Sequence, residues 1–265
     1  MLVAIDIGNT QTVVGLYEPG EGPAGSGPGL LHSWRISTVA SRTADEMAML
    51  LGQLFALEDL EAKKVITGFA VASVVPRLRT AMRDMADRWF GVPMVIVEPG
   101  IRTGMQILYD NPKEVGADRI ADAVAAFEQF GGPTIVIDFG TATTFEVVSE
   151  KGEYLGGVIL PGIEISLDAL FAKAALLPRV ELIEPRGVLA KNTVESVQAG
   201  AIYGFAAQVD GLCQRFEEEI GPCTVVATGG LAGLIGPASR AIDHHAPTLT
   251  LDGLRIIYGR NQAGG

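Results

Sequence analysis

The chain opens with short apolar runs in which β-branched residues alternate with polar ones. Residues 2–6 and 12–17 follow this alternation and predict two strands, and residues 30–37 predict a third. A stretch rich in glycine and proline, residues 18–29, separates the second run from the third and predicts a flexible hairpin tip. We therefore expect three consecutive strands at the start of the chain.

Helical spacing replaces the alternation at residues 43–57, where Thr43 and Glu46 form a capping-box pattern that marks the start of a helix. The elements expected next are a buried strand at 64–75, a helix at 76–89 and a strand at 93–97. Residues 118–130 carry apolar side chains at helical spacing and are followed by two glycines and a proline, which predicts a helix that ends there.

The opening pattern then recurs. Strands are expected at 134–138, 143–149 and 153–160, followed by a helix that begins after Pro161-Gly162 and ends near residue 175. Asn192 and Glu195 form a second capping-box pattern, which predicts a long helix to about residue 219. A strand at 223–227 and a short helix follow. The pattern at 254–261 fits a strand and a helix equally well.

The two halves also begin with related turns. Asp6-Ile7-Gly8-Asn9-Thr10 follows the first strand, and Asp138-Phe139-Gly140-Thr141-Ala142 follows its counterpart half the chain length later. Such repetition predicts two α/β domains of like topology that face each other across a cleft. We expect an N-terminal domain at 1–117 and a C-terminal domain at 118–265.

Composition narrows the possible classes of function. The 265 residues are 48% hydrophobic and 19% charged, which suits a sizeable core in one large domain or two smaller ones. Apolar runs stay below the roughly 18 residues of a membrane span, and the N-terminus lacks the basic segment of a signal peptide. The net charge of -11 argues against a nucleic-acid binder. Cys213 and Cys223 form no zinc motif and fit a reduced cytoplasm.

Each aspartate–glycine turn has the chemistry of a phosphate site. Asp6 at a strand end suits Mg²⁺ held through water, while Gly8 lets the backbone approach a ligand and the turn N–H groups can hold a phosphate. One such turn alone also fits an ordinary hairpin. Two of them favour a nucleotide triphosphate site, because a triphosphate needs donors on both sides.

A third motif, Thr228-Gly229-Gly230, follows the strand expected at 223–227. It would let a flat group such as adenine or ribose approach the backbone, although it also fits a plain strand-to-helix turn. The three motifs, in this order, resemble the phosphate 1, phosphate 2 and adenosine motifs of the superfamily of acetate kinase, hexokinase, actin and chaperone ATPases. The resemblance spans nearly the whole chain and implies a ribonuclease-H-like fold in each half, with ATP in the cleft.

A fourth motif, Gly116-Ala117-Asp118-Arg119, stands at the start of the helix expected at 118–130. The positive end of a helix favours an ionised carboxylate, so Asp118 can accept a proton from an alcohol or orient it toward the γ-phosphate. Arg119 can pair with an anionic substrate group or with the transferring phosphoryl group. By themselves, these residues also fit a helix cap followed by a surface arginine.

Together the four motifs resemble those of the type III pantothenate kinases. Gly156-Gly157, Leu160-Pro161-Gly162, Asn192-Thr193 and the run 249–261 also match that family. The resemblance implies that the chain phosphorylates pantothenate with ATP, giving 4′-phosphopantothenate for coenzyme A synthesis, as a cytoplasmic homodimer. Two alternatives are another small kinase of the superfamily and a regulatory protein of the Bvg accessory factor type.

The resemblance also assigns roles to individual residues. Those implied to bind ATP are Asp6, Ile7, Gly8, Asn9, Thr10, Gln11, Thr12, Val13, Thr141, Gly229 and Gly230. Those implied to bind pantothenate are Tyr109, Gly116, Ala117, Asp118, Arg119 and Thr193, the last from the partner subunit. Asp118 would be the catalytic base, and Asp138 would bind a monovalent cation, potassium or ammonium. On the long helix, Gly200 and Gly204 fit a dimer interface and packing within the chain equally well.

Overall fold

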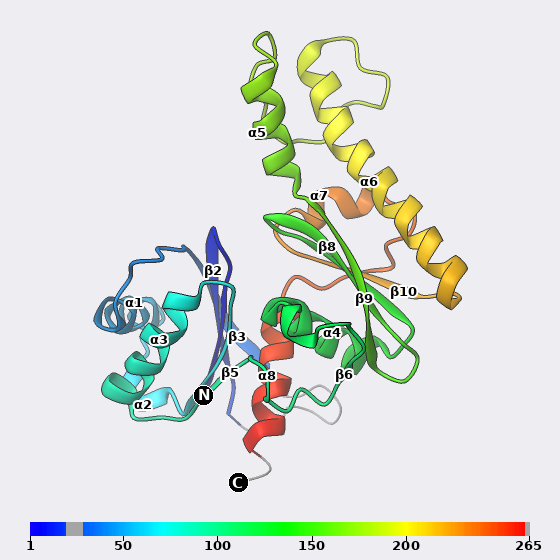
Figure 1. Cartoon of the computed structure of the whole chain (residues 1–265). Coiled ribbons are helices and arrows are strands. Elements are labelled where there is room, and N and C mark those ends of the chain that lie inside the picture. Colours follow the sequence, from blue (N-terminus) through cyan, green and yellow to red (C-terminus); the bar gives the residue numbers. More distant parts are fainter. Residues whose placement is uncertain (20–28, 263–265) are drawn as a thin grey trace. The chain divides into compact units, whose positions relative to one another are not determined.

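The computed structural model describes residues 1–19 and 29–262 (Figure 1). The chain divides into two compact units, each with its own mixed sheet and its own helices, which confirms the predicted α/β class. Unit 1 comprises Met1–Met105, Asp110–Ala125 and Thr250–Gly265, and unit 2 comprises Gln106–Tyr109 and Ala126–Leu249. The units are discontinuous in sequence, and the boundary expected between residues 117 and 118 stays a prediction.

The sheet of unit 1 has the strand order β3-β2-β1-β4-β5. Its strands are β1 (Leu2–Ile7), β2 (Gln11–Tyr17), β3 (Leu30–Ser37), β4 (Gly68–Ser73) and β5 (Met94–Ile96). The first three are antiparallel neighbours, while β4 runs parallel to β1 and to β5. The three strands expected at the start of the chain are confirmed, and most of the predicted hairpin tip lies outside the described residues.

The first helix of unit 1 begins where its predicted cap places it. Thr43 caps α1 (Ala44–Ala56), and both hydrogen bonds of its capping box with Glu46 are present. The other helical segments are α2 (Ala62–Val65), α3 (Pro76–Met85), η1 (Ala86–Phe90), η2 (Pro112–Glu114), the first part of α4 (Ala117–Phe130) and almost all of α8 (Leu249–Gln262). The helical form of α8 decides the alternative left open at 254–261.

One predicted strand of unit 1 was partly wrong. Residues 64 and 65 end the short helix α2, and β4 begins only at Gly68. A salt bridge of 2.6 Å between Lys64 and Glu61, three residues apart, accompanies the helical turn. Apolar content alone cannot separate a buried strand from the end of a buried helix.

The sheet of unit 2 repeats this arrangement. Its order is β11-β10-β7-β8-β9-β6, so that β9-β8-β7-β10-β11 corresponds to β3-β2-β1-β4-β5 of unit 1. The strands are β6 (Gln106–Ile107), β7 (Thr134–Phe139), β8 (Ala142–Val148), β9 (Glu153–Pro161), β10 (Thr224–Thr228) and β11 (His244–His245), and the helical segments are α5 (Ile163–Lys173), α6 (Thr193–Ile220), α7 (Ala232–Ile235) and η3 (Gly236–Ala238). This shared topology is the ribonuclease-H-like order expected for both halves.

Alternation along β1 separates two cores in unit 1. Val3, Ile5 and Ile7 point into a cluster with α1 and α3, whereas Ala4 belongs to a cluster on the opposite face with residues of α4 and α8. The core of unit 2 contains buried residues of β7, β8, α6 and β10. Among the described helices, none combines the length and the apolarity needed to cross a bilayer.

Candidate active site

The first predicted phosphate turn connects β1 to β2. Ile7 and Thr12 form the last pair of the ladder, and Gly8 N–H donates to the Gln11 carbonyl over 3.0 Å. Asn9, Thr10 and Gln11 are exposed in this turn. Exposed backbone at a strand end can supply N–H donors to a phosphate.

Two other residues of the predicted ATP loop are turned away from the surface. Thr12 is buried, and its Oγ1 shares a hydrogen bond of 2.8 Å with Thr38 Oγ1. Thr38 N–H also donates to the Thr10 carbonyl over 2.9 Å, and the Val13 side chain packs into the core. These contacts fix the base of the turn, and its exposed tip is formed by Asn9, Thr10 and Gln11.

Asp6 lies on the face of the unit 1 sheet that α4 covers. Successive strand residues alternate between faces, so the Asp6 side chain shares its face with Ala4. Ala4 packs in one cluster with Ala121 and Val124 of α4, and Ala117 at the start of that helix joins the cluster. The structure therefore brings Asp6 and the helix that carries Asp118 to the same side of one sheet.

Asp118 occupies the first turn of α4. Gly116 accepts the first helical hydrogen bond, from Ile120 N–H over 3.1 Å, and Asp118 Oδ1 accepts from Arg119 N–H over 2.9 Å. A side chain at Gly116 would overlap with Asp118 Oδ1, so glycine is needed there for the carboxylate to take this position. The carboxylate is half-buried, and Arg119 is only 9% exposed.

The second phosphate turn connects β7 to β8 and is one residue shorter. Gly140 N–H donates to the Ala142 carbonyl over 3.0 Å, and a Cβ on Gly140 would lie 3.2 Å from Asp138 Oδ2. The carboxylate of Asp138 thus lies directly beside the turn. Thr141, which the resemblance implies to bind ATP, is exposed at its tip.

Two further segments of unit 2 meet this turn. β10 runs parallel to β7 with Thr228 opposite Asp138, so that Gly229 packs against the Asp138 carboxylate and the backbone of Phe139. Gly162 N–H, at the N-cap of α5, donates to the Thr141 carbonyl over 3.2 Å. In the structure the second phosphate motif contacts both Thr228-Gly229-Gly230 and Gly162. The sequence had indicated Gly162 only as part of a family match.

Tyr109 and Thr193 also belong to unit 2. Tyr109 follows β6, an element that was not predicted because two residues show no periodicity. Thr193 is the first residue of α6, whose N-cap Asn192 accepts from Glu195 N–H over 2.9 Å, as the cap pattern predicts. Arg186 forms a bidentate salt bridge with Glu195, with N–O distances of 2.6 and 2.9 Å. This salt bridge lowers the pKa of Glu195 and connects the preceding loop to the start of α6.

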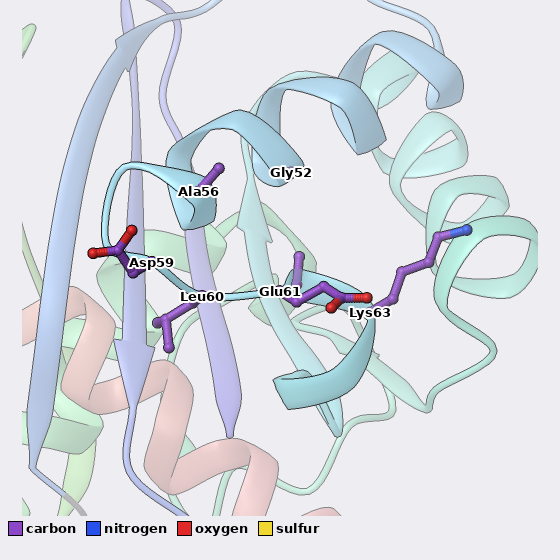
Figure 2. Close-up of a pocket in the computed structure, with 7 residues that line it drawn as sticks. Gly52, Ala56, Asp59, Leu60, Glu61 and Lys63 are labelled. Carbon is purple, nitrogen blue, oxygen red and sulfur yellow. The ribbon is translucent and has the colours of Figure 1, made fainter.

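Unit 1 carries a surface pocket of about 440 Å³ (Figure 2). It is lined by Gly52, Ala56, Asp59, Leu60, Glu61, Ala62 and Lys63, between the end of α1 and the start of α2. None of the predicted site residues is among them. The pocket therefore contributes nothing to the candidate site.

Asp6 and Asp138 are the acidic residues of the two turns that could hold a cation. The described residues contain no group of three or more histidine, cysteine or acidic side chains able to hold a metal. Mg²⁺ in phosphotransfer enzymes commonly needs only one or two carboxylates together with water and substrate phosphates. Asp6 and Asp138 suit that arrangement, because each is a single carboxylate next to a phosphate-type turn.

Comparisons with known proteins decide the family. The family model for type III pantothenate kinase matches residues 2–215. A type III pantothenate kinase from Myxococcus xanthus is 52% identical over 264 residues, covering 99% of this chain and all of the relative, and one from Moorella thermoacetica is 51% identical over 262 residues, covering 98% and 100%. The chain belongs to the type III pantothenate kinase family. Full-length identity at this level favours that family over the two alternatives.

Solved structures agree on the fold. A protein described as a Baf family transcriptional activator from Campylobacter jejuni superposes with a TM-score of 0.61 at 17% identity, covering 98% of this chain and 99% of the other. A ROK family protein from Streptococcus pneumoniae, solved with sucrose, gives a TM-score of 0.51 at 12% identity over 100% and 99% of the two chains. At these identities the likeness concerns the fold alone, which supports two ribonuclease-H-like halves in this type III pantothenate kinase family member.

Proposed function

We propose that this chain transfers the γ-phosphoryl group of ATP to the 4′-hydroxyl of pantothenate. Membership of the type III pantothenate kinase family over essentially the full length carries the proposal. The site geometry supports it, because the Gly-Ala-Asp-Arg motif starts a helix on the same sheet face as Asp6, and the second turn lies against Gly229. Each turn would bind phosphate groups of ATP, and the backbone near Gly229 and Gly230 would receive the adenosine.

The proposed step forms a bond between the 4′-oxygen and the γ-phosphorus and breaks the bond from that phosphorus to the β–γ bridging oxygen, so that ADP leaves. The proton of the 4′-hydroxyl goes to Asp118, the catalytic base. The transition state is loose and anionic, so positioning and charge stabilisation supply most of the rate. Arg119 would face the anionic part of pantothenate or the moving phosphoryl group.

Two cations complete the proposal. Asp6 would hold Mg²⁺ through water, and Asp138 would hold potassium or ammonium next to the second turn. Oxygen donors of this kind are what hard cations prefer. A bound Mg²⁺ would supply charge neutralisation at the phosphates. Asp138 would hold its cation, and its Oδ1 and Oδ2 lie beside Gly229 and Gly140 respectively.

We also propose that the chain acts as a homodimer in the cytoplasm, with Thr193 completing the pantothenate site of the partner subunit. Unit 2 exposes several large apolar side chains, Ile159, Ile165, Leu170, Leu176, Ile183, Val188, Leu189 and Val194. A pocket of about 500 Å³ there is lined by residues 188–190 and by α6, including Gly200 and Gly204. Large exposed apolar side chains beside a surface pocket favour a protein interface here.

The two glycines favour an interface over packing within the chain. A Cβ at Gly200 or Gly204 would meet no described atom within 4 Å. The bare stripe of α6 is therefore open for a second helix to approach closely.

Cys213 and Cys223 are both free thiols, which fits the reduced cytoplasm.

The decisive experiment is a coupled assay of ADP release, with pantothenate, glucose, mannose or acetate as acceptor, and with or without potassium. We expect turnover with pantothenate, stimulation by potassium and a product of the mass of 4′-phosphopantothenate. Turnover with a sugar or acetate and none with pantothenate would reject the proposal in favour of another kinase of the superfamily. No turnover with any acceptor would favour the regulatory alternative.

A further inference from the structure

Tyr109 is held on β9 by backbone pairing. β6 runs parallel to β9, with Gln106 opposite Glu153 and Ile107 opposite Tyr154. Leu108 N–H then donates to the Tyr154 carbonyl over 2.8 Å. The backbone immediately before Tyr109 therefore follows the start of β9.

The Tyr109 ring rests on two residues of the same strand. Its centroid lies 6.3 Å from that of Tyr154, at an interplanar angle of 61°, the edge-to-face arrangement that aromatic rings favour. Tyr154 is completely buried, so it offers a fixed support. A Cβ on Gly156 would lie 3.8 and 3.9 Å from Cε2 and Cδ2 of Tyr109, so the ring also lies close to bare backbone.

A β-bulge in β9 produces this support for the Tyr109 ring. Gly156 pairs with Val147, but Tyr154 pairs with Val148, so Leu155 is an extra residue on β9. Such a bulge re-aims the side chains around it and is common beside active sites. Gly156 takes a φ of +132°, which side chains of L-residues rarely adopt. The bulge with its glycine therefore permits the contact between Tyr109 and β9.

We propose that Tyr154 and Gly156 are positioning residues that fix the Tyr109 ring and so raise the affinity for pantothenate. This inference rests on the proposed function and on Tyr109 as a wall of the pantothenate pocket. An aromatic ring that is already held in place loses less conformational entropy when the ligand binds, so its apolar surface contributes more to affinity. Neither Tyr154 nor Gly156 needs to touch the substrate.

A double-mutant cycle tests whether Tyr154 acts through Tyr109. Tyr109→Ala, Tyr154→Leu and the double variant are compared with the unaltered chain by KM for pantothenate, KM for ATP and kcat, with melting temperature as a check of folding. We expect Tyr154→Leu to raise KM for pantothenate roughly threefold to tenfold, the range of an aromatic pair, and to leave KM for ATP unchanged. In the Tyr109→Ala background the same change should add nothing.

Two more variants keep the test decisive if Tyr154→Leu fails to fold. Tyr154→Phe keeps the ring and should restore pantothenate KM to near the unaltered value. Gly156→Ala should raise pantothenate KM, whereas Gly221→Ala should not. Gly221 is a matched control, because it also has a positive φ, of +90°, and has open space around it at the end of α6.

The outcomes separate the positioning role from the kinase assignment. Three outcomes would overturn the positioning role while the kinase assignment stands. They are additive effects in the cycle, equal changes in the KM values for pantothenate and ATP, and a normal pantothenate KM in Gly156→Ala. An unaltered chain that turns over ATP with another acceptor but not with pantothenate would overturn both.

Discussion

Gly229 lies so close to Asp138 that a side chain at position 229 would overlap with the carboxylate oxygen Oδ1 and approach Phe139 N to 2.6 Å. Asp138 lies in β7 and Gly229 directly follows the neighbouring parallel strand β10, and their close approach joins the second phosphate turn to the predicted adenosine motif. Only glycine fits this position, because φ is also +90° there. The carboxylate of Asp138 therefore lies where the second phosphate turn meets the motif Thr228-Gly229-Gly230.

Gly229→Ala should therefore lower both stability and ATP affinity. The added methyl group must displace Asp138 or the backbone of β7, a kind of overpacking that costs roughly 1–3 kcal/mol. Urea unfolding and the KM for ATP measure the two effects. Gly52→Ala is the matched control, since a Cβ there meets nothing within 4 Å and alanine favours the helix α1. Equal behaviour of the two variants would contradict the proposed contact.

Asp118→Asn should lower kcat by roughly 10²-fold or more, as expected when a positioned base is lost. The amide keeps the size and the hydrogen bond from Arg119 N–H, so the helix start should survive. Steady-state kinetics with saturating ATP and pantothenate measure the change. Glu114→Gln, an exposed acidic residue four positions earlier, is the control and should keep its activity. A near-normal kcat in Asp118→Asn would remove the catalytic assignment.

The sequence predicted what depends on local pattern and missed what depends on close approach between segments. The cap at Thr43 and the repeated turns at Asp6 and Asp138 are local signals, and each appears as predicted. The packing of Gly229 against Asp138 depends on pairing between segments that are distant in sequence, and so does the formation of strand β6. Two residues such as Gln106–Ile107 carry no period, and only their partner β9 makes them a strand.

Leu189→Glu should convert a dimer into a monomer and raise KM for pantothenate. Leu189 is 88% exposed beside the open stripe of α6, and a charge placed there would be buried without a partner in the proposed interface. Size-exclusion chromatography with light scattering gives the mass, and kinetics gives KM. Leu57→Glu, at a residue 75% exposed in unit 1, is the control and should change neither quantity. A dimer that survives Leu189→Glu would argue against this face as the interface.

Thr43→Ala should reduce the free energy of unfolding by about 1 kcal/mol at neutral pH, the usual cost of losing an N-cap. Thr43 Oγ1 accepts from Glu46 N–H over 3.3 Å, and Glu46 Oε2 accepts from Thr43 N–H over 2.7 Å and from its hydroxyl over 3.1 Å. These two donors, the backbone N–H first, hold the pKa of Glu46 below its ordinary value. Chemical unfolding followed by circular dichroism measures the change.

The pH dependence separates the two halves of this capping box. A carboxylate whose pKa is lower in the folded chain stabilises it above the pKa of the unfolded state, and this stabilisation is lost as pH falls through the folded pKa. Alanine removes the hydroxyl that helps Glu46, so the gap between Thr43→Ala and the unaltered chain should narrow in acid. It should not vanish, because the bond from Glu46 N–H to Thr43 Oγ1 does not titrate. A Glu46→Gln background, which cannot ionise, should show a Thr43→Ala cost that stays constant across the same pH range. A gap that stays constant or widens in acid would mean that the hydroxyl of Thr43 does not stabilise the ionised carboxylate of Glu46.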